Sequence, residues 1–232
     1  MSNRLQIILE KYGLQRGIER HNFLIKYVLR EHAKKYTYRG RVIDLGCGNS
    51  EFRELILTTA QEYVGVDHPE SRYQGLYTDI RADISRHIPC PEASFDTAIA
   101  FQVLDDLPEP SLFLDECFRL LKPNGSLFLT VPFMWKLHEE PHDYFRFTKY
   151  GLMYLLKKSG FKEVQVIEIY SGFWGMWILK FNYFSLSLLR PWNKYFLYAL
   201  WWFLQVMAIF LDQFSFSQSR SEATHYSVTA SK

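Results

Sequence analysis

Residues 42–50 of this chain read Val42-Ile43-Asp44-Leu45-Gly46-Cys47-Gly48-Asn49-Ser50. A short apolar run that ends in two glycines predicts a buried strand followed by a tight turn. Such a turn lets the backbone approach a bound ligand closely, as in nucleotide-binding folds. Asp44 precedes the turn, and its negative charge would repel a phosphate but suit a ligand that carries a positive charge. Ser50 leaves the three-glycine dinucleotide fingerprint incomplete, which disfavours a nicotinamide-dependent dehydrogenase.

Strands and helices are expected to alternate on both sides of this stretch. Thr148 is the expected N-cap of one helix, and Lys122-Pro123-Asn124-Gly125 is the expected end of another. This alternation predicts an α/β fold with a mostly parallel sheet and helices on both faces. The expected strands are 63–67, 97–101, 126–131, 163–170 and 224–230, and the expected helices are 14–36, 51–60, 112–121 and 148–158.

Two further carboxylates follow at positions suited to a nucleoside. Asp67 ends the second strand, 21 positions after Gly46, where a carboxylate can accept hydrogen bonds from both ribose hydroxyls. Asp83 lies in the next segment and could accept from an adenine amino group. The residues alone therefore indicate a nucleoside ligand with a cationic part.

An ordered set of motifs extends over about residues 40–170. The set comprises Asp44-Leu45-Gly46-Cys47-Gly48, Gly65-Val66-Asp67, Asp83 with Ser94-Phe95-Asp96, Arg119-Leu120-Leu121-Lys122-Pro123-Asn124-Gly125, Leu129-Thr130-Val131-Pro132 and Gly160-Phe161. In this order and spacing the set resembles the class I S-adenosylmethionine-dependent methyltransferases. The resemblance implies S-adenosyl-L-methionine as cofactor. It also implies a Rossmann-like, seven-stranded, mostly parallel sheet in which strands 6 and 7 usually form a hairpin. Here a long stretch separates the expected strands 163–170 and 224–230, which predicts a helical, aromatic-rich insertion between strands 6 and 7.

The same resemblance implies a role for each matching residue. Gly46 and Gly48 would pass beneath the methionine part of the cofactor, Asp44 would lie near its amino group, and Asp67 would hold the ribose. The complete set of residues expected to bind the cofactor is Asp44, Gly46, Cys47, Gly48, Asp67, His68, Asp83, Ile84, Phe101 and Gln102.

The segment after the strand at 126–131 should face the cofactor, because ligands bind beyond the carboxyl ends of parallel strands. Methyl transfer to a hydroxyl needs a base, and imidazole titrates near neutral pH. His142 beside Asp143 is the first candidate for this base, and His138 is the second. Trp135, Tyr144 and Arg146 are expected to contact the substrate, although Arg146 also fits a structural helix-entry element. No metal site is expected, because the spacing of His138, Glu139 and His142 lacks a supporting cluster elsewhere.

Residues 139–148 also resemble a subgroup of bacterial methyltransferases that is associated with polysaccharide or glycolipid assembly. This resemblance implies O-methylation of a sugar or of a lipid-linked glycan. Two alternatives are a methyltransferase for a small lipid or quinone-like acceptor, and a non-catalytic, membrane-associated interaction protein on the same scaffold.

Residues 171–214 depart from the α/β pattern. They hold five of the six tryptophans, and they contain no acidic residue before Asp212. We consider three interpretations: an interfacial membrane anchor, a core-packed lid or homodimer surface, and a bilayer-spanning segment over residues 195–211. The last is disfavoured, because the final strand must rejoin the same sheet.

Composition and length favour one domain over residues 1–232. The expected parts are an N-terminal helical cap (1–38), a cofactor-binding core (39–170), the aromatic insertion (171–222) and the final strand (223–232). The 27 Lys and Arg nearly balance the 25 Asp and Glu, which argues against a nucleic-acid partner. Three scattered cysteines and no signal-peptide pattern predict a cytoplasmic protein, with peripheral binding to the inner face of the membrane as an extension.

Overall fold

The computed structural model describes residues 23–71, 77–169, 173–188, 194–214 and 223–232. These residues divide into two compact units. The sheet unit contains residues 34–169 and 224–232, and the helical unit contains the described residues up to 33 and those between 173 and 223. The domain boundaries predicted at residues 38, 170 and 222 stay predictions.

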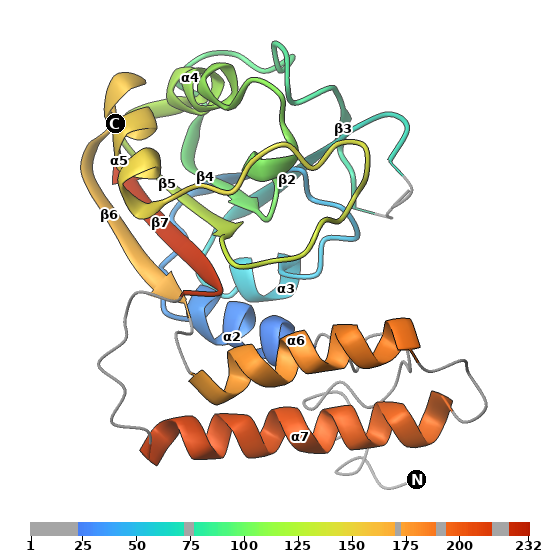
Figure 1. Ribbon diagram of the computed structural model, residues 1–232. Coiled ribbons are helices and arrows are strands. Elements are labelled where there is room, and N and C mark those ends of the chain that lie inside the picture. The colour runs from blue at the N-terminus through green and yellow to red at the C-terminus, as the bar shows by residue number, and fades with distance from the viewer. Residues whose placement is uncertain (1–22, 72–76, 170–172, 189–193, 215–222) are drawn as a thin grey trace, which may run out of the picture. The chain divides into compact units, whose positions relative to one another are not determined.

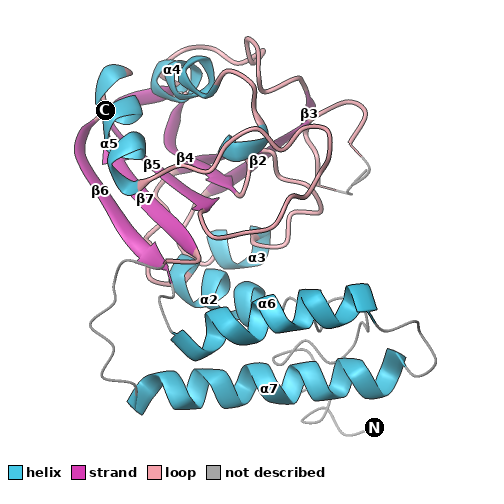
Figure 2. Cartoon of the chain, in the orientation of Figure 1, coloured by secondary structure: helices cyan, strands magenta, loops and turns pink. Residues whose placement is uncertain are grey.

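The sheet unit is built on one seven-stranded sheet with the order β3-β2-β1-β4-β5-β7-β6 (Figure 2). Strands β1 to β5 pair in parallel, whereas β7 runs antiparallel to both of its neighbours. The predicted seven-stranded, mostly parallel sheet is therefore confirmed. The strands are β1 (Arg41–Leu45), β2 (Glu62–Asp67), β3 (Ile80–Arg81), β4 (Phe95–Phe101), β5 (Leu121–Pro132), β6 (Lys162–Ile169) and β7 (His225–Ser231).

The helices of the sheet unit are α3 (Arg53–Ile56), the 3₁₀ turn η2 (Leu104–Asp106), α4 (Pro110–Leu120) and α5 (Lys149–Lys158). The Thr148 cap is confirmed, because its side-chain oxygen accepts from the Gly151 N–H at 3.1 Å. The helix predicted over 51–60 is a single turn. The strand predicted from Ser126 begins earlier, at Leu121, with a register shift between Phe95 and Thr97 of β4.

Burial of the central strands supplies the core of this unit. The side chains of Val42, Ile43 and Leu45 have no exposed surface, and neither do Ala98 and Ile99 of β4. A parallel strand that is covered on both faces needs such a continuous apolar run, in place of alternation. Asp44 interrupts the run near the carboxyl end of β1, which places a carboxylate directly before the glycine turn.

The helical unit contains α2 (Phe23–Ala33), α6 (Phe173–Leu188) and α7 (Lys194–Phe214), and α6 packs along α7 (Figure 1). Asp212 fixes this pairing, because its carboxylate accepts from the backbone N–H groups of Trp174 and Gly175, both at 2.9 Å. The helical insertion predicted between strands 6 and 7 is confirmed. Residues 14–22 of the helix predicted over 14–36 lie outside the described residues.

None of the helices in the described part of the chain combines the length and the apolarity that crossing a bilayer requires.

Candidate functional site

The site lies in the sheet unit, where the order of the strands reverses. After β1 the chain proceeds to β2 and β3 on one side, and after β4 it proceeds to β5 on the other. Ligands of open α/β sheets bind at such a switch point, beyond the carboxyl ends of the strands. The turns that follow β1, β4 and β5 therefore define the site.

The turn after β1 is tight and takes conformations that favour glycine. Gly46 and Gly48 have φ angles of +78° and +52°. The N–H groups of Gly46 and Cys47 both donate to the Val66 carbonyl, at 2.8 and 3.0 Å, which ties the turn to β2. A Cβ atom on Gly46 would lie 2.6 Å from Cγ2 of Val103, so the turn after β4 approaches this glycine directly.

Asp44 is buried at the base of this turn, and it is 3% exposed. The Tyr63 hydroxyl donates to its Oδ2 at 2.6 Å. Burial raises the pKa of Asp44 to about 7, although the Tyr63 hydrogen bond works in the opposite direction. A cationic group of a ligand placed beside this carboxyl would favour its ionised form.

Asp67 offers one oxygen to a ligand. Its Oδ1 accepts from the His68 N–H at 2.9 Å, whereas its Oδ2 is buried and has no donor among the described residues. A buried carboxylate oxygen without a partner is costly, and two hydroxyl donors would satisfy it. His68 is exposed, and its Nδ1 accepts from the Glu70 N–H at 3.2 Å.

Asp83 is already engaged within its own turn. Its Oδ1 accepts from the backbone N–H and the hydroxyl of Ser85, and its Oδ2 lies 3.1 Å from Arg86 Nε. The Ser85 hydrogen bond lowers the pKa of Asp83. Ile84 is buried beside the glycine turn, with its Cδ1 3.4 Å from the Cβ position of Gly46.

Phe101 ends β4, and Gln102 follows it in the turn that approaches Gly46 through Val103. The Phe101 ring stacks on the Phe52 ring, with centroids 4.3 Å apart. Gln102 has a φ of +56°, and its side-chain amide donates to Thr130 Oγ1 at 2.9 Å. The Gln102 amide is therefore directed to β5, and this hydrogen bond fixes the direction in which the chain leaves β4.

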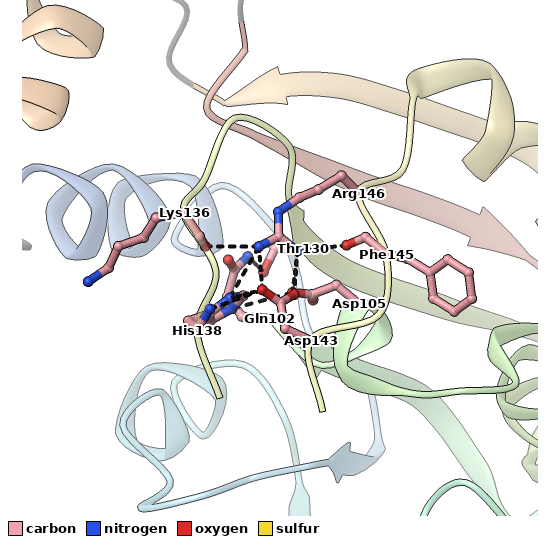
Figure 3. Close-up of polar contacts among 8 residues, drawn as sticks. All are labelled: Gln102, Asp105, Thr130, Lys136, His138, Asp143, Phe145 and Arg146. Carbon is pink, nitrogen blue, oxygen red and sulfur yellow. Dashed lines mark hydrogen bonds and ion pairs between the residues drawn. The ribbon is translucent and has the colours of Figure 1, made fainter. Parts of the chain in front are cut away.

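A polar cluster joins the turn after β4 to the loop after β5 (Figure 3). Two backbone hydrogen bonds make this connection, because the N–H groups of Tyr144 and Phe145 donate to the Asp105 carbonyl at 3.0 and 3.1 Å. The cluster contains Asp105, Asp106, His138, Asp143 and Arg146.

Asp143 contacts His138 and Arg146. Its Oδ2 accepts from the His138 N–H at 3.0 Å and lies 3.0 Å from His138 Nδ1. Both terminal nitrogens of Arg146 bind the Asp143 carboxylate, and one of them also donates to the Lys136 carbonyl at 2.9 Å. The Arg146 guanidinium holds the pKa of Asp143 well below its usual range. Arg146 therefore holds the Asp143 carboxylate in place, and this carboxylate in turn orients the His138 imidazole.

Asp105 and Asp106 complete the cluster, and the sequence did not single them out. Asp105 has no exposed surface, and its Oδ2 lies 3.4 Å from His138 Nε2. Burial, with a smaller contribution from Asp106, raises the pKa of Asp105 to about 7, and burial raises that of Asp106 to about 6. Their position directly after a central strand was the signal that could have identified them.

No hydrogen bond or ion pair joins His142, the first candidate for the base, to Asp143 among the described residues. His142 is exposed, and its Nδ1 lies 3.3 Å from the Tyr144 hydroxyl, which belongs to another exposed residue.

The Trp135 ring lies 5.6 Å from the ring of His225 on β7. His225 was not identified as a site residue from the sequence. Burial lowers the pKa of His225 to about 3, so this imidazole is neutral near pH 7.

Comparison with known proteins agrees with this geometry. The family described as "Methyltransferase domain" matches residues 43–129, which include most of β1 and all of β2, β3 and β4. A probable S-adenosylmethionine-dependent methyltransferase of Mycolicibacterium smegmatis is 33% identical over 96 residues, which are 39% of this chain and 37% of that protein. The ubiquinone biosynthesis O-methyltransferase of Xanthomonas euvesicatoria pv. vesicatoria is 31% identical over 101 residues, which are 39% of this chain and 42% of that protein.

The alignments thus span less than half the length of these relatives. A crystal structure of a SAM-dependent methyltransferase from Archaeoglobus fulgidus superimposes with a TM-score of 0.58 at 16% identity, and covers 98% of this chain and 99% of that one. This likeness concerns the fold.

Proposed function

From its membership of the class I S-adenosylmethionine-dependent methyltransferases, we propose that this chain transfers the methyl group of S-adenosylmethionine to a hydroxyl oxygen. One observation carries the proposal. The turn after β4 places Val103 against the glycine turn of the cofactor site, and two residues later Asp105 lies against His138. The cofactor and the groups that activate an acceptor therefore share one edge of the sheet.

The reaction is a direct displacement at the methyl carbon. A lone pair of the acceptor oxygen forms the C–O bond, the C–S bond breaks, and its electron pair stays on sulfur, which yields S-adenosylhomocysteine. Alignment of oxygen, carbon and sulfur supplies much of the acceleration. The hydroxyl must also lose its proton, and the cluster of Asp105, Asp106 and His138 is where this loss is assisted.

The affinity for S-adenosylhomocysteine is expected to rise about tenfold per pH unit up to about pH 7 and then to level off. Below the raised pKa of about 7, Asp44 is protonated and offers no charge to the amino group of the ligand. Binding therefore costs the ionisation of Asp44 at acidic pH, and this cost disappears as pH rises through 7. Calorimetry between pH 5.5 and 8.5 measures the profile.

Two variants test the assignment of this profile to Asp44. Tyr63→Phe removes the hydrogen bond that favours the ionised carboxylate, so the profile should move to higher pH. Asp44→Asn should bind more weakly with a flat profile. If the affinity of Asp44→Asn rises with pH as steeply as that of the parent, a group other than Asp44 titrates.

The acceptor that we propose is a sugar hydroxyl, in a lipid-linked glycan. Support comes from the resemblance of residues 139–148 to methyltransferases of polysaccharide and glycolipid assembly. A quinone-like lipid is the second candidate, because the Xanthomonas relatives are named ubiquinone biosynthesis O-methyltransferases. Both acceptors are hydroxyl compounds that reside at a membrane.

The helical unit carries the features that would bring the protein to such acceptors. On α6 the side chains of Trp177, Phe181 and Phe184 are 60%, 53% and 60% exposed, and on α7 Phe203 and Phe210 are each 54% exposed. Exposed aromatic residues spaced by three, four or seven positions form a stripe on a helix. Aromatic stripes of this kind favour the headgroup region of a bilayer.

Replacing Trp177 and Phe181 together by serine is expected to reduce co-sedimentation with anionic phospholipid vesicles and to leave binding of S-adenosylhomocysteine unchanged. Tyr150→Ser on α5 of the sheet unit is the matched control, because Tyr150 is 78% exposed and should not affect vesicle binding. Equal sedimentation of all variants would contradict the membrane role.

The acceptor itself is tested by methyl transfer. With S-adenosylmethionine labelled in its methyl group and a bacterial lipid extract, label should enter a lipid-linked glycan. Label in a quinone fraction would favour the second acceptor.

A further inference from the structure

We propose that Asp105, Asp106 and Nε2 of His138 hold a divalent metal ion that accepts both carboxylate and imidazole ligands, such as Mn²⁺. This proposal rests on the proposed function only in the role that it gives to the ion, which is to activate the acceptor hydroxyl. Binding of the ion itself requires neither S-adenosylmethionine nor an acceptor.

The ligand atoms already lie close together. One ligand atom from each of Asp105, Asp106, His138 and Asp143 lies within 4.8 Å of every other. His138 Nε2 and Asp105 Oδ2 are 3.4 Å apart. Ligands about 2.0–2.2 Å from a metal lie about 3.3–3.6 Å apart at tetrahedral positions and about 2.8–3.1 Å apart at octahedral ones, so this pair needs to close by no more than a few tenths of an ångström.

The Asp105 side chain is a second, independent indication of a ligand. It has no exposed surface, and neither of its carboxylate oxygens accepts a hydrogen bond from any residue in the described part of the chain. Its nearest cationic neighbour besides the His138 imidazole is Arg146, at 3.9 Å, and that guanidinium is committed to Asp143. A fully buried carboxylate without a donor is rare, because its desolvation is not compensated. Asp106 Oδ1 is also buried and without a partner among the same residues.

Asp143 has a different part in this arrangement. It contacts Nδ1 of His138, which is the nitrogen on the opposite side of the ring from Asp105. Metal-binding histidines characteristically donate their other ring N–H to a carboxylate, which fixes the tautomer that leaves the remaining nitrogen free to bind. The Arg146 guanidinium neutralises Asp143 and leaves the two negative charges of Asp105 and Asp106 to be balanced by one divalent cation.

The mixed ligand set indicates the class of metal. Carboxylates suit Mg²⁺, Ca²⁺ and Mn²⁺, whereas imidazole suits later transition metals, and Mn²⁺ accepts both. A cation at this position would lower the pKa of an acceptor hydroxyl that approaches the cofactor. This effect assists the loss of the proton that methyl transfer to oxygen requires.

The test uses the full chain, freed of metal with a chelator and titrated with Mn²⁺, with the free ion followed by electron paramagnetic resonance. We expect saturable binding of one Mn²⁺ per chain. Asp105→Asn, which keeps the shape of the side chain, should show no saturable binding at concentrations that saturate the parent. Asp143→Asn should weaken binding about 10–100-fold, because it disturbs the orientation of His138. Glu140→Gln is the matched control, since it removes a nearby exposed charge outside the ligand set, and it should bind as the parent does.

Thermal unfolding shows that the variants are folded and gives a second readout. Mn²⁺ should raise the unfolding temperature of the parent and not that of Asp105→Asn, whose unfolding temperature without metal should equal or exceed that of the parent. Absence of saturable binding by the parent would overturn the proposal. Equal binding by Asp105→Asn would overturn it as well.

Calorimetry with S-adenosylhomocysteine on the same samples separates this proposal from the proposed function. Ligand binding without Mn²⁺ binding overturns the metal site and leaves the methyltransferase in place. Mn²⁺ binding without ligand binding supports the metal site and counts against the proposed function.

Discussion

Replacing Gly46 by alanine is expected to weaken binding of S-adenosylhomocysteine strongly in calorimetry. Gly46 has a φ of +78°, which L-residues rarely adopt, and a Cβ there would lie 2.6 and 3.2 Å from the two methyl carbons of Val103. Either the glycine turn or the turn after β4 must move. A strain of about 1–3 kcal/mol is typical for such a position. The movement separates the cofactor loop from its partners, so we expect the affinity to fall on the order of 100-fold or more, equivalent to about 2.8 kcal/mol.

Gly151→Ala is the matched control for this substitution. Gly151 lies in α5, and an added Cβ would meet only the Thr148 hydroxyl, at 3.3 Å. Alanine in a helix is more favourable than glycine by about 1 kcal/mol, so this variant should be at least as stable as the parent and bind normally. A Gly46→Ala protein that folds and binds the nucleoside with parental affinity would refute the placement of the cofactor.

Replacing His138 by alanine is expected to lower kcat about 10²–10⁴-fold and to leave the affinity for S-adenosylhomocysteine unchanged. His138 lies between Asp143 and Asp105, 3.0 and 3.4 Å from their carboxylate oxygens, and its loss removes the central group of the cluster. His142→Ala should change kcat by less than about twofold, because surface substitutions away from such clusters have small effects. Steady-state kinetics with labelled S-adenosylmethionine compare the two variants.

The opposite ranking of these two histidines would restore His142 as the first candidate for the base. A loss of cofactor affinity in His138→Ala would mean that the cluster supports the cofactor loop and does not act on the acceptor. Both histidines lie in the loop after β5, so the two variants make the same substitution in the same loop.

Most of the fold was predictable because its signals are local. The apolar run of β1, the glycine turn and the cap at Thr148 each follow from neighbouring residues, and each was found close to its predicted place. The two-residue strand β3 was missed, because so short a run carries no periodicity. The helix after the glycine turn was overestimated, because its apolar pattern does not show where the backbone leaves the helical conformation.

The site was less predictable, because its contacts depend on how the loops fold. The chain reverses between His138 and Asp143 through a turn in which Glu139 has a φ of +47° and its carbonyl accepts from the His142 N–H at 3.0 Å. This turn brings together two residues that are five positions apart and directs His142 outward. The residue types alone do not show whether Asp143 contacts His138 or His142.

His225 shows a second limit of the sequence. It pairs with Pro132 across the antiparallel contact of β7 with β5, so residues separated by more than 90 positions meet at the same edge of the sheet. Asp105 could have been noticed, because it follows β4 in sequence, but His225 could be placed only once the order of the strands was known.

The strand order also has a consequence for synthesis on the ribosome. Strand β6 pairs only with β7 in the described sheet, and residues 173–214 are made between the two. During translation β6 therefore remains without a hydrogen-bonded neighbour until residues 225–231 have left the exit tunnel. An exposed strand edge of this kind is a template for aberrant pairing. A nascent polypeptide stalled before residue 225 should accordingly depend on chaperones far more than the finished chain does.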